Sequence, residues 1–311
     1  KEDFLAVREE IYELLSYKKV FKVLDIDIPD DKIDNFRRLC RYPACNFLYG
    51  NLPSPLGPPY HQFAPKNMLY TYPFINYLSK ELTDTISHSL SENFLKITSL
   101  LGITHIITLP TLLGAGEEET YVLLKTGIEW DDRFLVSGAK PPLVYGETKL
   151  PIILASNVKK PRKKEGFIKE GTFFIASDWQ DFLKEITIDY EKGKINFIPV
   201  LENDSYESLP FEAELKVYDY FLKHNEVQIE YELNNLSFLR LPISYYPYLK
   251  VYLDDKEIPF YETKDHFIYL KSAKGRHILK VVFTLPPLRK YTLIFSLISF
   301  IISIFLIIIK K

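Results

Sequence analysis

The sequence predicts an α+β protein: an N-terminal mixed α/β domain, then an antiparallel β-sandwich, then one C-terminal transmembrane helix. Helical and strand periodicities mix over residues 1–156, which we assign to the α/β domain. About seven short strands separated by short turns follow over residues 186–285, a pattern typical of a β-sandwich. Residues 157–185 are a predicted linker with a strand and a short helix. Residues 286–311 comprise a stiff connector and an apolar helix long enough to span a membrane.

Two regular elements and a long irregular segment are predicted in the first part of the chain. Apolar residues recur at helical spacing over residues 3–18, which indicates an amphipathic helix. Residues 21–27, FKVLDID, alternate like a strand. Residues 28–66 are irregular, and the stretch GNLPSPLGPPYHQFAP within them holds five prolines, which helix interiors and central strands exclude. A loop this long is usually functional or covers another part of the protein.

The rest of the first domain mixes helix and strand. Residues 67–101 are predicted to be mostly helical, with a break near Thr83 and Asp84. The strands expected after this helix cover residues 103–110, 120–126, 142–147 and 151–156. The basic stretch VKKPRKKEG, residues 158–166, matches nuclear-signal and anionic-lipid patterns, but we interpret it as a solvated part of the linker.

The prediction of a β-sandwich depends on two hairpin patterns. ITIDYEKGKINFIPV, residues 186–200, reads as a hairpin with its turn at Lys192-Gly193. In SYYPYLKVYLDDKEIPFYE, residues 244–262, apolar and polar residues alternate along LKVYL, so one face of that strand is buried. Three carboxylates follow in Asp254-Asp255-Lys256-Glu257, and such a cluster could bind a metal ion. Because Asp tolerates turn conformations, we interpret them as a hairpin tip instead.

Composition argues against several classes of function. The formal net charge is −2, so no basic excess points to a nucleic-acid partner. The six histidines are scattered and no Gly-rich phosphate loop is present, so the sequence predicts neither a metal nor a cofactor. The two cysteines, Cys40 and Cys45, lack the further ligands of a zinc site. A local disulfide outside the cytoplasm and two ordinary buried thiols both remain open.

The clearest feature is the C-terminal apolar run YTLIFSLISFIISIFLIII. These residues, 291–309, carry no charge, and at about 1.5 Å per residue such a helix just spans a bilayer core. Basic residues flank both ends, Arg289-Lys290 before the run and Lys310-Lys311 after it, so charge does not set the orientation. The start, KEDFLAVREEIYELL, has no signal-peptide pattern. We therefore expect the C-terminal piece of a longer membrane protein, with a tail-anchored cytosolic protein as the alternative.

The proline-rich loop supplies the candidate binding residues. Tyr60, His61 and Phe63 place two aromatic rings and an imidazole on a rigid loop, where they could face a sugar or a lipid headgroup. Packing within the loop itself is the alternative interpretation.

The order of features after about residue 100 resembles one family. SLLGITHIIT (99–108) is similar to the strand "lgvkyvl" of that family, and LVYGETKLPIILASN (143–157) to its segment leading to "LPrayl". ISYYPYLKVYLDDKEIPFYETKDHFIYLKSAKGRHILKVVF (243–283) is similar to its last sandwich strands, and PPLRKYTLIFSLISFIISIFLIII (286–309) to its last transmembrane helix. The family comprises the large polytopic membrane proteins of the YfhO type and the related pyruvoyl-tetrahydropterin-synthase-related proteins, a GT-C-like glycosyltransferase group.

The match has departures. Asp255 stands where the family usually has the turn glycine, which predicts a different turn, and Tyr248 stands near its tryptophan. Residues 1–98 match only in general style.

The resemblance implies a function for the whole protein. The chain would be the C-terminal extracytoplasmic region of a membrane glycosyltransferase-like protein that uses a polyprenyl-phosphate-linked sugar. It would cover the membrane active site and assist binding of the acceptor or glycan, with the lipid bilayer as a further partner. In GT-C enzymes the catalytic acidic residue lies in an early loop that has no counterpart here, so no catalytic residue is carried over. A non-catalytic membrane-anchored protein of the cell envelope or surface, with the sandwich as an interaction module, is the alternative.

Overall fold

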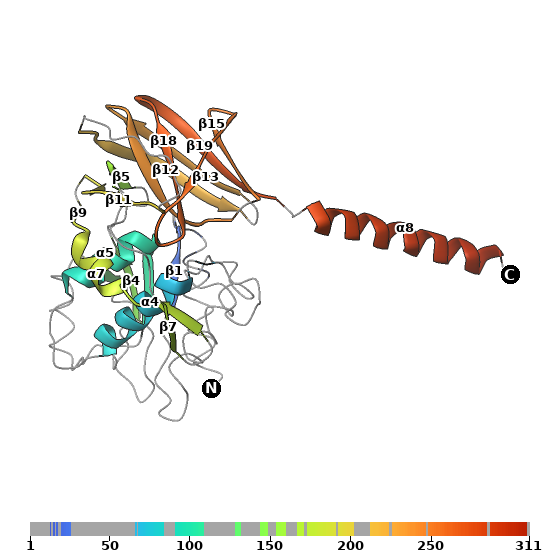
Figure 1. Ribbon diagram of the computed structural model, residues 1–311, viewed down its shortest axis with the longest axis horizontal. Helices are drawn as coiled ribbons and strands as arrows, with labels where there is room; N and C mark the ends of the chain where they lie inside the picture. Colours follow the sequence, from blue (N-terminus) through green and yellow to red (C-terminus); the bar gives the residue numbers. More distant parts are fainter. Residues whose placement is uncertain are drawn as a thin grey trace.

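The fold is that of a computed structural model, drawn in Figure 1, and it is α+β with several antiparallel sheets. The structure describes Glu13, Leu15, Tyr17, Lys66 and residues 20–25, 68–83, 91–108, 128–131, 144–148, 154–159, 167–170, 173–190, 192–201, 212–223, 226–246, 248–284 and 287–309.

A four-stranded sheet with the order β1-β2-β4-β3 belongs to the predicted first domain. β1 (Val23–Asp25) and β2 (His105–Thr108) confirm the strands predicted over 21–27 and 103–110, and the structure shows that they pair in parallel. β4 (Val144–Thr148) lies antiparallel to β2 and also to β3 (Ile128–Asp131). β3 was not predicted, and the strand predicted over 120–126 lies outside the described residues.

The helical region predicted over 67–101 consists of two helices. α4 (Met68–Thr83) ends at the predicted break, and α5 (Glu92–Leu101) follows. The N-cap of α5 is Ser91, whose hydroxyl accepts from the backbone N–H of Phe94 at 3.2 Å. Gly102 ends α5 with a φ of 69°. A Cβ atom there would lie 2.4 Å from Cγ of Pro242, so only glycine fits this close approach.

A six-stranded sheet with the order β17-β18-β14-β5-β10-β9 forms the middle of the molecule. Its strands are β5 (Leu154–Ser156), β9 (Ile188–Asp189), β10 (Lys194–Ile195), β14 (Ser237–Ser244), β17 (Tyr261–Glu262) and β18 (Phe267–Ser272). β9 and β10 confirm the predicted hairpin, with Gly193 at a φ of 62° in its turn. β5 pairs with both β14 and β10, so this sheet contains residues from both sides of the predicted boundary at 156.

A five-stranded antiparallel sheet with the order β12-β13-β19-β15-β16 packs on one face of that sheet. Its strands are β12 (Leu215–Lys223), β13 (Glu226–Leu233), β15 (Leu249–Leu253), β16 (Lys256–Ile258) and β19 (Gly275–Phe283). Buried and partly exposed residues alternate along β13, because alternate side chains of a strand point to opposite faces. The two sheets enclose one core, an arrangement compatible with the expected β-sandwich.

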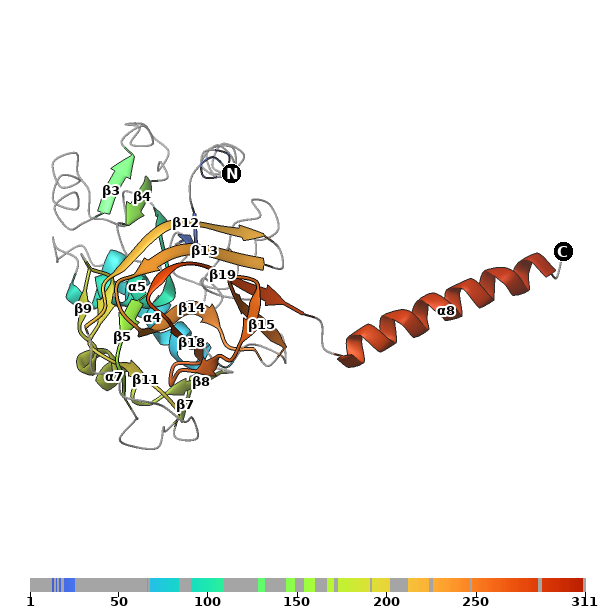
Figure 2. The same cartoon turned by 90° about the horizontal axis from the view of Figure 1, so that it is seen from above.

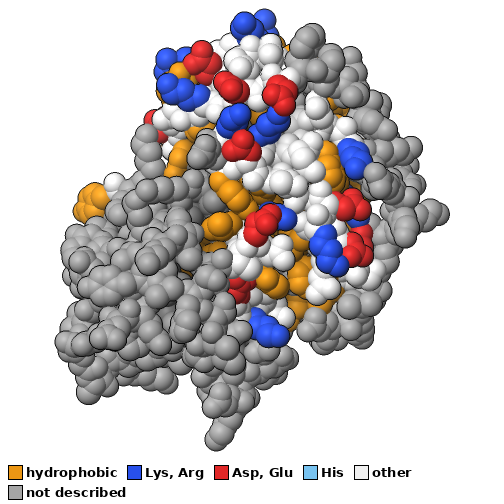
Figure 3. Space-filling view, turned by 90° about the vertical axis from the view of Figure 1, so that its left-hand side faces the viewer, with side chains coloured by type: hydrophobic (Ala, Val, Ile, Leu, Met, Phe, Trp, Pro, Cys, Tyr) orange, Lys and Arg blue, Asp and Glu red, His pale blue; other side chains and the backbone are white. Residues whose placement is uncertain are grey.

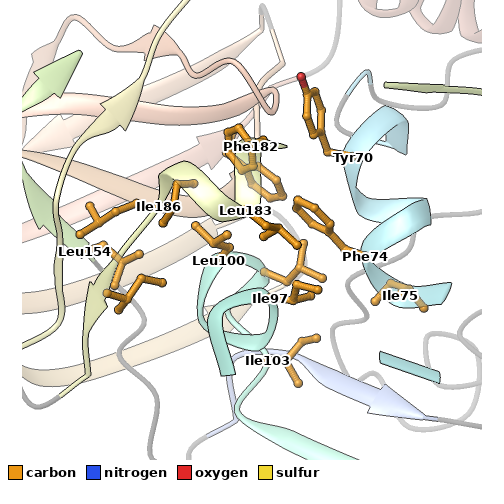
Figure 4. Packing of buried hydrophobic residues seen from close by; sticks show 14 of the residues in the cluster. Tyr70, Phe74, Ile75, Ile97, Leu100, Ile103, Leu154, Phe182, Leu183 and Ile186 are labelled. Carbon is orange, nitrogen blue, oxygen red and sulfur yellow. The ribbon is translucent and has the colours of Figure 1, made fainter. Parts of the chain in front are cut away.

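The other face of the six-stranded sheet packs against helices. In β14, Leu239 lies in the core between the sheets, whereas Phe238 lies in a second core with side chains of α4, α5 and α7. α7 (Trp179–Glu185) falls within the predicted linker, and its Phe182 and Leu183 are buried in this second core. Figure 4 shows Phe182 and Leu183 beside Tyr70 and Phe74 of α4 and Leu100 of α5. The arrangement is therefore three layers: sheet, sheet and helices.

Two further pairs of short strands flank these layers. β7 (Phe167–Glu170) and β8 (Phe173–Ala176) form a hairpin, and β8 packs beside α4. β6 (Val158–Lys159) pairs in parallel with β11 (Ile198–Pro199). Val158 of β6 and Ile175 and Ala176 of β8 are buried in the second core, so the residues predicted as a linker contribute to the body of the protein.

The C-terminal run forms one long helix, α8 (Pro287–Ile309), as predicted. It projects away from the layered body in both Figure 1 and Figure 2. Of its side chains, the structure describes those of Tyr291, Thr292 and residues 294–304. Within the described part of the chain, no helix is both long and apolar enough to cross a membrane.

Candidate functional site

The binding residues predicted from sequence lie outside the described residues. This holds for Tyr60, His61 and Phe63 of the proline-rich loop and for Cys40 and Cys45. The loop's role and the state of the two thiols therefore stay predictions.

The carboxylates of residues 254–257 lie at the tip of a hairpin, as predicted. Leu253 pairs with Lys256, so Asp254 and Asp255 are the two central residues of the turn. Their φ angles are 50° and 63°, the positive values of a type I′ turn. Asp is among the few residues that adopt such angles, which explains how the turn forms where the resembled family has glycine.

Each of these carboxylates has a structural partner. Asp254 accepts from the backbone N–H of Ile278 at 2.9 Å and contacts Nδ1 of His277 at 2.7 Å. Partial burial raises the pKa of Asp254, but the contacts with Ile278 and His277 together lower it by more. The pKa of Asp254 is therefore below its ordinary value. Asp255 accepts from Lys280 at 2.6 Å, and Glu257 from Lys250 at 3.0 Å. The tip thus ties the β15–β16 hairpin to β19. Among the described residues, no group of three or more His, Cys, Asp or Glu could hold a metal ion.

A buried ion pair joins the middle sheet to the helix layer. Arg240 of β14 and Asp265, in the turn before β18, are at most 1% exposed, and Nη2 of Arg240 lies 2.5 Å from Oδ2 of Asp265. Nη1 of Arg240 donates to the carbonyl oxygen of Leu100 in α5 at 2.8 Å. The hydroxyl of Thr263 donates to the other oxygen of Asp265 at 2.7 Å. Hydrogen bonds of this kind are what make a buried charge tolerable.

Lys22 approaches the same pair from the start of β1. Its ammonium group donates to the carbonyl oxygen of Pro242 and lies 5.6 Å from the centre of the Phe267 ring. The guanidinium of Arg240 lies 4.6 Å from that ring. Burial and the charge of Arg240 lower the pKa of Lys22 to about 7. Lys22 is only partly buried, and this remaining contact with solvent reduces the desolvation that lowers its pKa.

A second polar group lies beside the first, nearer the surface. Nδ1 of His266 contacts Oε1 of Glu262 at 2.7 Å, and Lys264 forms an ion pair with Asp178, just before α7. The hydroxyl of Tyr70 in α4 donates to the other oxygen of Asp178 at 3.0 Å. Through Lys264 and Asp178, the turn over residues 263–266 links the six-stranded sheet to the start of α7 and to Tyr70 of α4, whereas Arg240 makes the bond to α5. These contacts fix the layers relative to one another.

One feature of the sequence indicates this buried cluster. Arg240 is the single charge in the strand LSFLRLPI. A charge inside a continuous apolar run indicates burial with a partner. The identity of that partner, 25 residues further along the chain, follows only from the fold.

The end of the five-stranded sheet next to α8 is the second candidate surface. The rings of Tyr246 and Tyr248 form an edge-to-face pair with centroids 5.3 Å apart, and both are exposed. Thr284, the residue after β19, bonds to the carbonyl oxygen of Tyr248 through both its backbone N–H and its hydroxyl. Exposed apolar side chains then continue along α8, among them Phe295, Phe300 and Ile301.

The face turned away from α8 has a different character. In Figure 3, Lys, Arg, Asp and Glu side chains are spread over the described part of this face, and hydrophobic side chains lie between them. Ion pairs between neighbouring strands, such as Arg276 with Glu230 at 2.6 Å, are typical of a solvated sheet surface.

Comparison of the chain with protein-family models, with curated proteins and with solved structures finds no match in any of the three. The fold alone therefore defines the class: this is an α+β protein with antiparallel sheets and a projecting C-terminal helix.

Proposed function

We propose that this chain is a membrane-proximal module that α8 anchors in a lipid bilayer. The observation that carries the proposal is the exposed apolar surface of α8, which leaves the body directly after the end of β19. Phe295 and Phe300 are 76% and 63% exposed, and every other described residue from 294 to 304 except Ser296, Ser299 and Ser303 is also apolar. Apolar surface of this extent is rarely left in water by a soluble protein.

The serines of α8 fit this proposal. The hydroxyl of Ser303 donates to the carbonyl oxygen of Ser299, one helical turn back, at 2.8 Å. A serine bonded in this way presents no unsatisfied donor to lipid. Transfer of each large apolar side chain from water into lipid contributes about 1.5–3 kcal/mol, so a few of them suffice to hold the chain at a membrane.

The task proposed for the anchored module comes from the resemblance in sequence. The module would cover the membrane active site of a GT-C-like glycosyltransferase on the outer face of the membrane and assist binding of the acceptor or of the lipid-linked glycan. Tyr60, His61 and Phe63 are the proposed contact residues, because aromatic rings suit the apolar faces of a sugar.

Sugar transfer by the proposed longer protein tests this task. Membranes that contain it are given a radiolabelled polyprenyl-phosphate sugar, and transfer to the endogenous acceptor is measured with the loop intact and with all three residues replaced by alanine. The proposal predicts that transfer falls while the amount of protein in the membrane is unchanged. Equal transfer by the two proteins would refute the role of the loop.

The alternative function, a non-catalytic interaction module, draws on the outer face of the five-stranded sheet. A register shift in β12 between Val217 and Asp219 sets Tyr218 out of the regular pairing. The ring of Tyr218 lies 4.4 Å from the guanidinium of Arg276 and 4.7 Å from the ammonium of Lys216. Photo-crosslinking from position 218 in intact membranes, compared with a sheet position at Lys271, would detect a protein partner on this face.

A further inference from the structure

We propose that Tyr246, Tyr248 and Phe283 form the surface through which the body rests on the lipid bilayer, with the two tyrosine hydroxyls among the headgroups. This inference deepens the proposed anchoring by α8 and rests on it. The occupant is the interfacial layer of the membrane, a region a few ångströms deep where apolar rings and polar groups are both accommodated.

The three side chains are exposed and lie at one end of one sheet. Tyr246, Tyr248 and Phe283 are 37%, 39% and 41% exposed. Phe283, the last residue of β19, is paired across the sheet with Leu249, the residue after Tyr248. The backbone N–H of Leu249 also donates to the carbonyl oxygen of Tyr246 at 3.0 Å, which holds the two tyrosines in one tight turn.

The connector to α8 keeps this end of the sheet near the membrane. Thr284 is bonded to Tyr248, and α8 begins only three residues later, at Pro287. Three residues of extended chain span at most about 10 Å. The anchored body therefore cannot move far from the start of α8, and the turn with Tyr246 and Tyr248 is among the parts of the body nearest to that start.

The chemistry of the surface matches a bilayer interface. Tyrosine combines an apolar ring with a hydroxyl and is enriched at both membrane–water interfaces. In the sequence, the basic residues Arg289 and Lys290 directly precede the apolar run, and basic residues next to a membrane span are attracted to lipid headgroups. Farther along the same sheet, charged side chains form pairs, as in the contact of Lys280 with Asp255. Tyr246 and Tyr248 are the exposed aromatic pair at the end next to the anchor.

Tryptophan fluorescence in vesicles tests this contact. The full chain with Tyr248→Trp is reconstituted into phosphatidylcholine vesicles whose lipids carry bromine near the top of their acyl chains, and the parent spectrum is subtracted. The matched control is Tyr252→Trp, in β15, which directly follows Tyr248; position 252 lies four residues farther from α8, or roughly 13 Å along the chain. Bromine should quench the added fluorescence of the Tyr248 variant at least about twofold more strongly, as expected for an interfacial residue.

A measurement on the unaltered chain guards against misfolding of the variants. Lactoperoxidase iodinates accessible tyrosines but is too large to enter the headgroup layer. Peptide mass spectrometry should show Tyr246 and Tyr248 less iodinated than Tyr252 in vesicles, relative to their ratio in the denatured chain.

The two proposals fail in different ways. A chain that does not bind vesicles overturns the anchoring itself. A second outcome is a chain that binds vesicles but shows equal quenching at positions 248 and 252 and equal iodination of Tyr248 and Tyr252. This outcome supports the anchoring by α8 and refutes the proposed contact surface.

Discussion

Thr284 and Tyr248 join the last strand of the body to the turn that precedes β15: the backbone N–H of Thr284 donates to the carbonyl oxygen of Tyr248 at 3.3 Å. The hydroxyl of Thr284 bonds to the same oxygen. These two bonds hold the end of the body from which the chain continues to α8 against the turn that contains Tyr246 and Tyr248. This relationship is the structural basis for placing that end of the sheet at the membrane.

The first prediction concerns the buried ion pair. Asp265→Ala leaves the guanidinium of Arg240 buried without its carboxylate and should lower the free energy of unfolding by roughly 3–5 kcal/mol. Urea unfolding followed by circular dichroism in a mild detergent measures this change. Lys184→Ala breaks an exposed pair with Asp181 and should change stability by less than about 1 kcal/mol. A similar loss for both variants would contradict the role given to the buried pair.

The second prediction concerns the contact between α5 and β14. Gly102→Ala should destabilise the protein by about 2–3 kcal/mol, because the new Cβ would meet Pro242 and the φ of 69° is unfavourable for alanine. Adding Pro242→Ala removes the clash but not the backbone strain, so the double variant should recover part of the loss beyond what the two single changes predict. Strict additivity in thermal unfolding would show that the close approach does not limit stability.

The third prediction concerns pH. The pKa of Lys22 is lowered from 10.5 to about 7 in the folded protein. Below pH 7 both states carry the proton, so the cost of holding the charge is fully present. Between pH 7 and 10.5 the unfolded state binds more protons, so stability rises with pH, and above 10.5 it levels off. Urea unfolding at pH 7 and pH 9 measures the rise.

Lys22→Met is the reference for that experiment, since other groups also titrate. The variant should show a smaller gain between pH 7 and pH 9, because it has no ammonium group to lose. If the parent and the variant gain equally, Lys22 keeps an ordinary pKa and is not part of the buried cluster.

The fourth prediction concerns the hairpin tip. Asp255→Gly should stabilise the protein by about 0.5–1 kcal/mol, because glycine adopts a φ of 63° without steric cost and the lost pair with Lys280 is largely exposed. Asp255→Val should have the opposite effect, since a β-branched residue fits this angle poorly. The order Gly, Asp, Val in thermal midpoints supports a type I′ turn, and an unchanged midpoint for valine would argue against it.

Local patterns in the sequence were enough to predict the local elements. The hairpin at Lys192-Gly193, the turn at Asp254-Asp255 and the helix over 291–309 each depend on residues close together in the chain, and each is present in the structure. Turn residues and periodicity act over a few positions, which is why they can be read without the fold.

Pairings between distant segments could not be predicted in this way. Strand β5 lies at the end of the predicted first domain but pairs with β14, more than 80 residues later. Arg240 likewise joins Leu100 and Asp265 from two other elements. No local period encodes such contacts, so the three-layer arrangement and its buried cluster became visible only in the structure. The predicted binding residues Tyr60, His61 and Phe63 stay predictions, because they lie outside the described residues.

Flotation with phospholipid vesicles tests the anchoring by α8 most directly. The chain is mixed with phosphatidylcholine vesicles, washed at alkaline pH and centrifuged through a density gradient. The comparison variant carries Phe295→Asp, Ile298→Asp and Ile302→Asp, each of which adds roughly 3 kcal/mol to the cost of membrane insertion. Lys184→Asp, at an exposed position of α7, is the control. The account predicts that the parent and the control float and that the triple variant stays at the bottom; a parent that stays at the bottom, or a triple variant that floats equally, would contradict it.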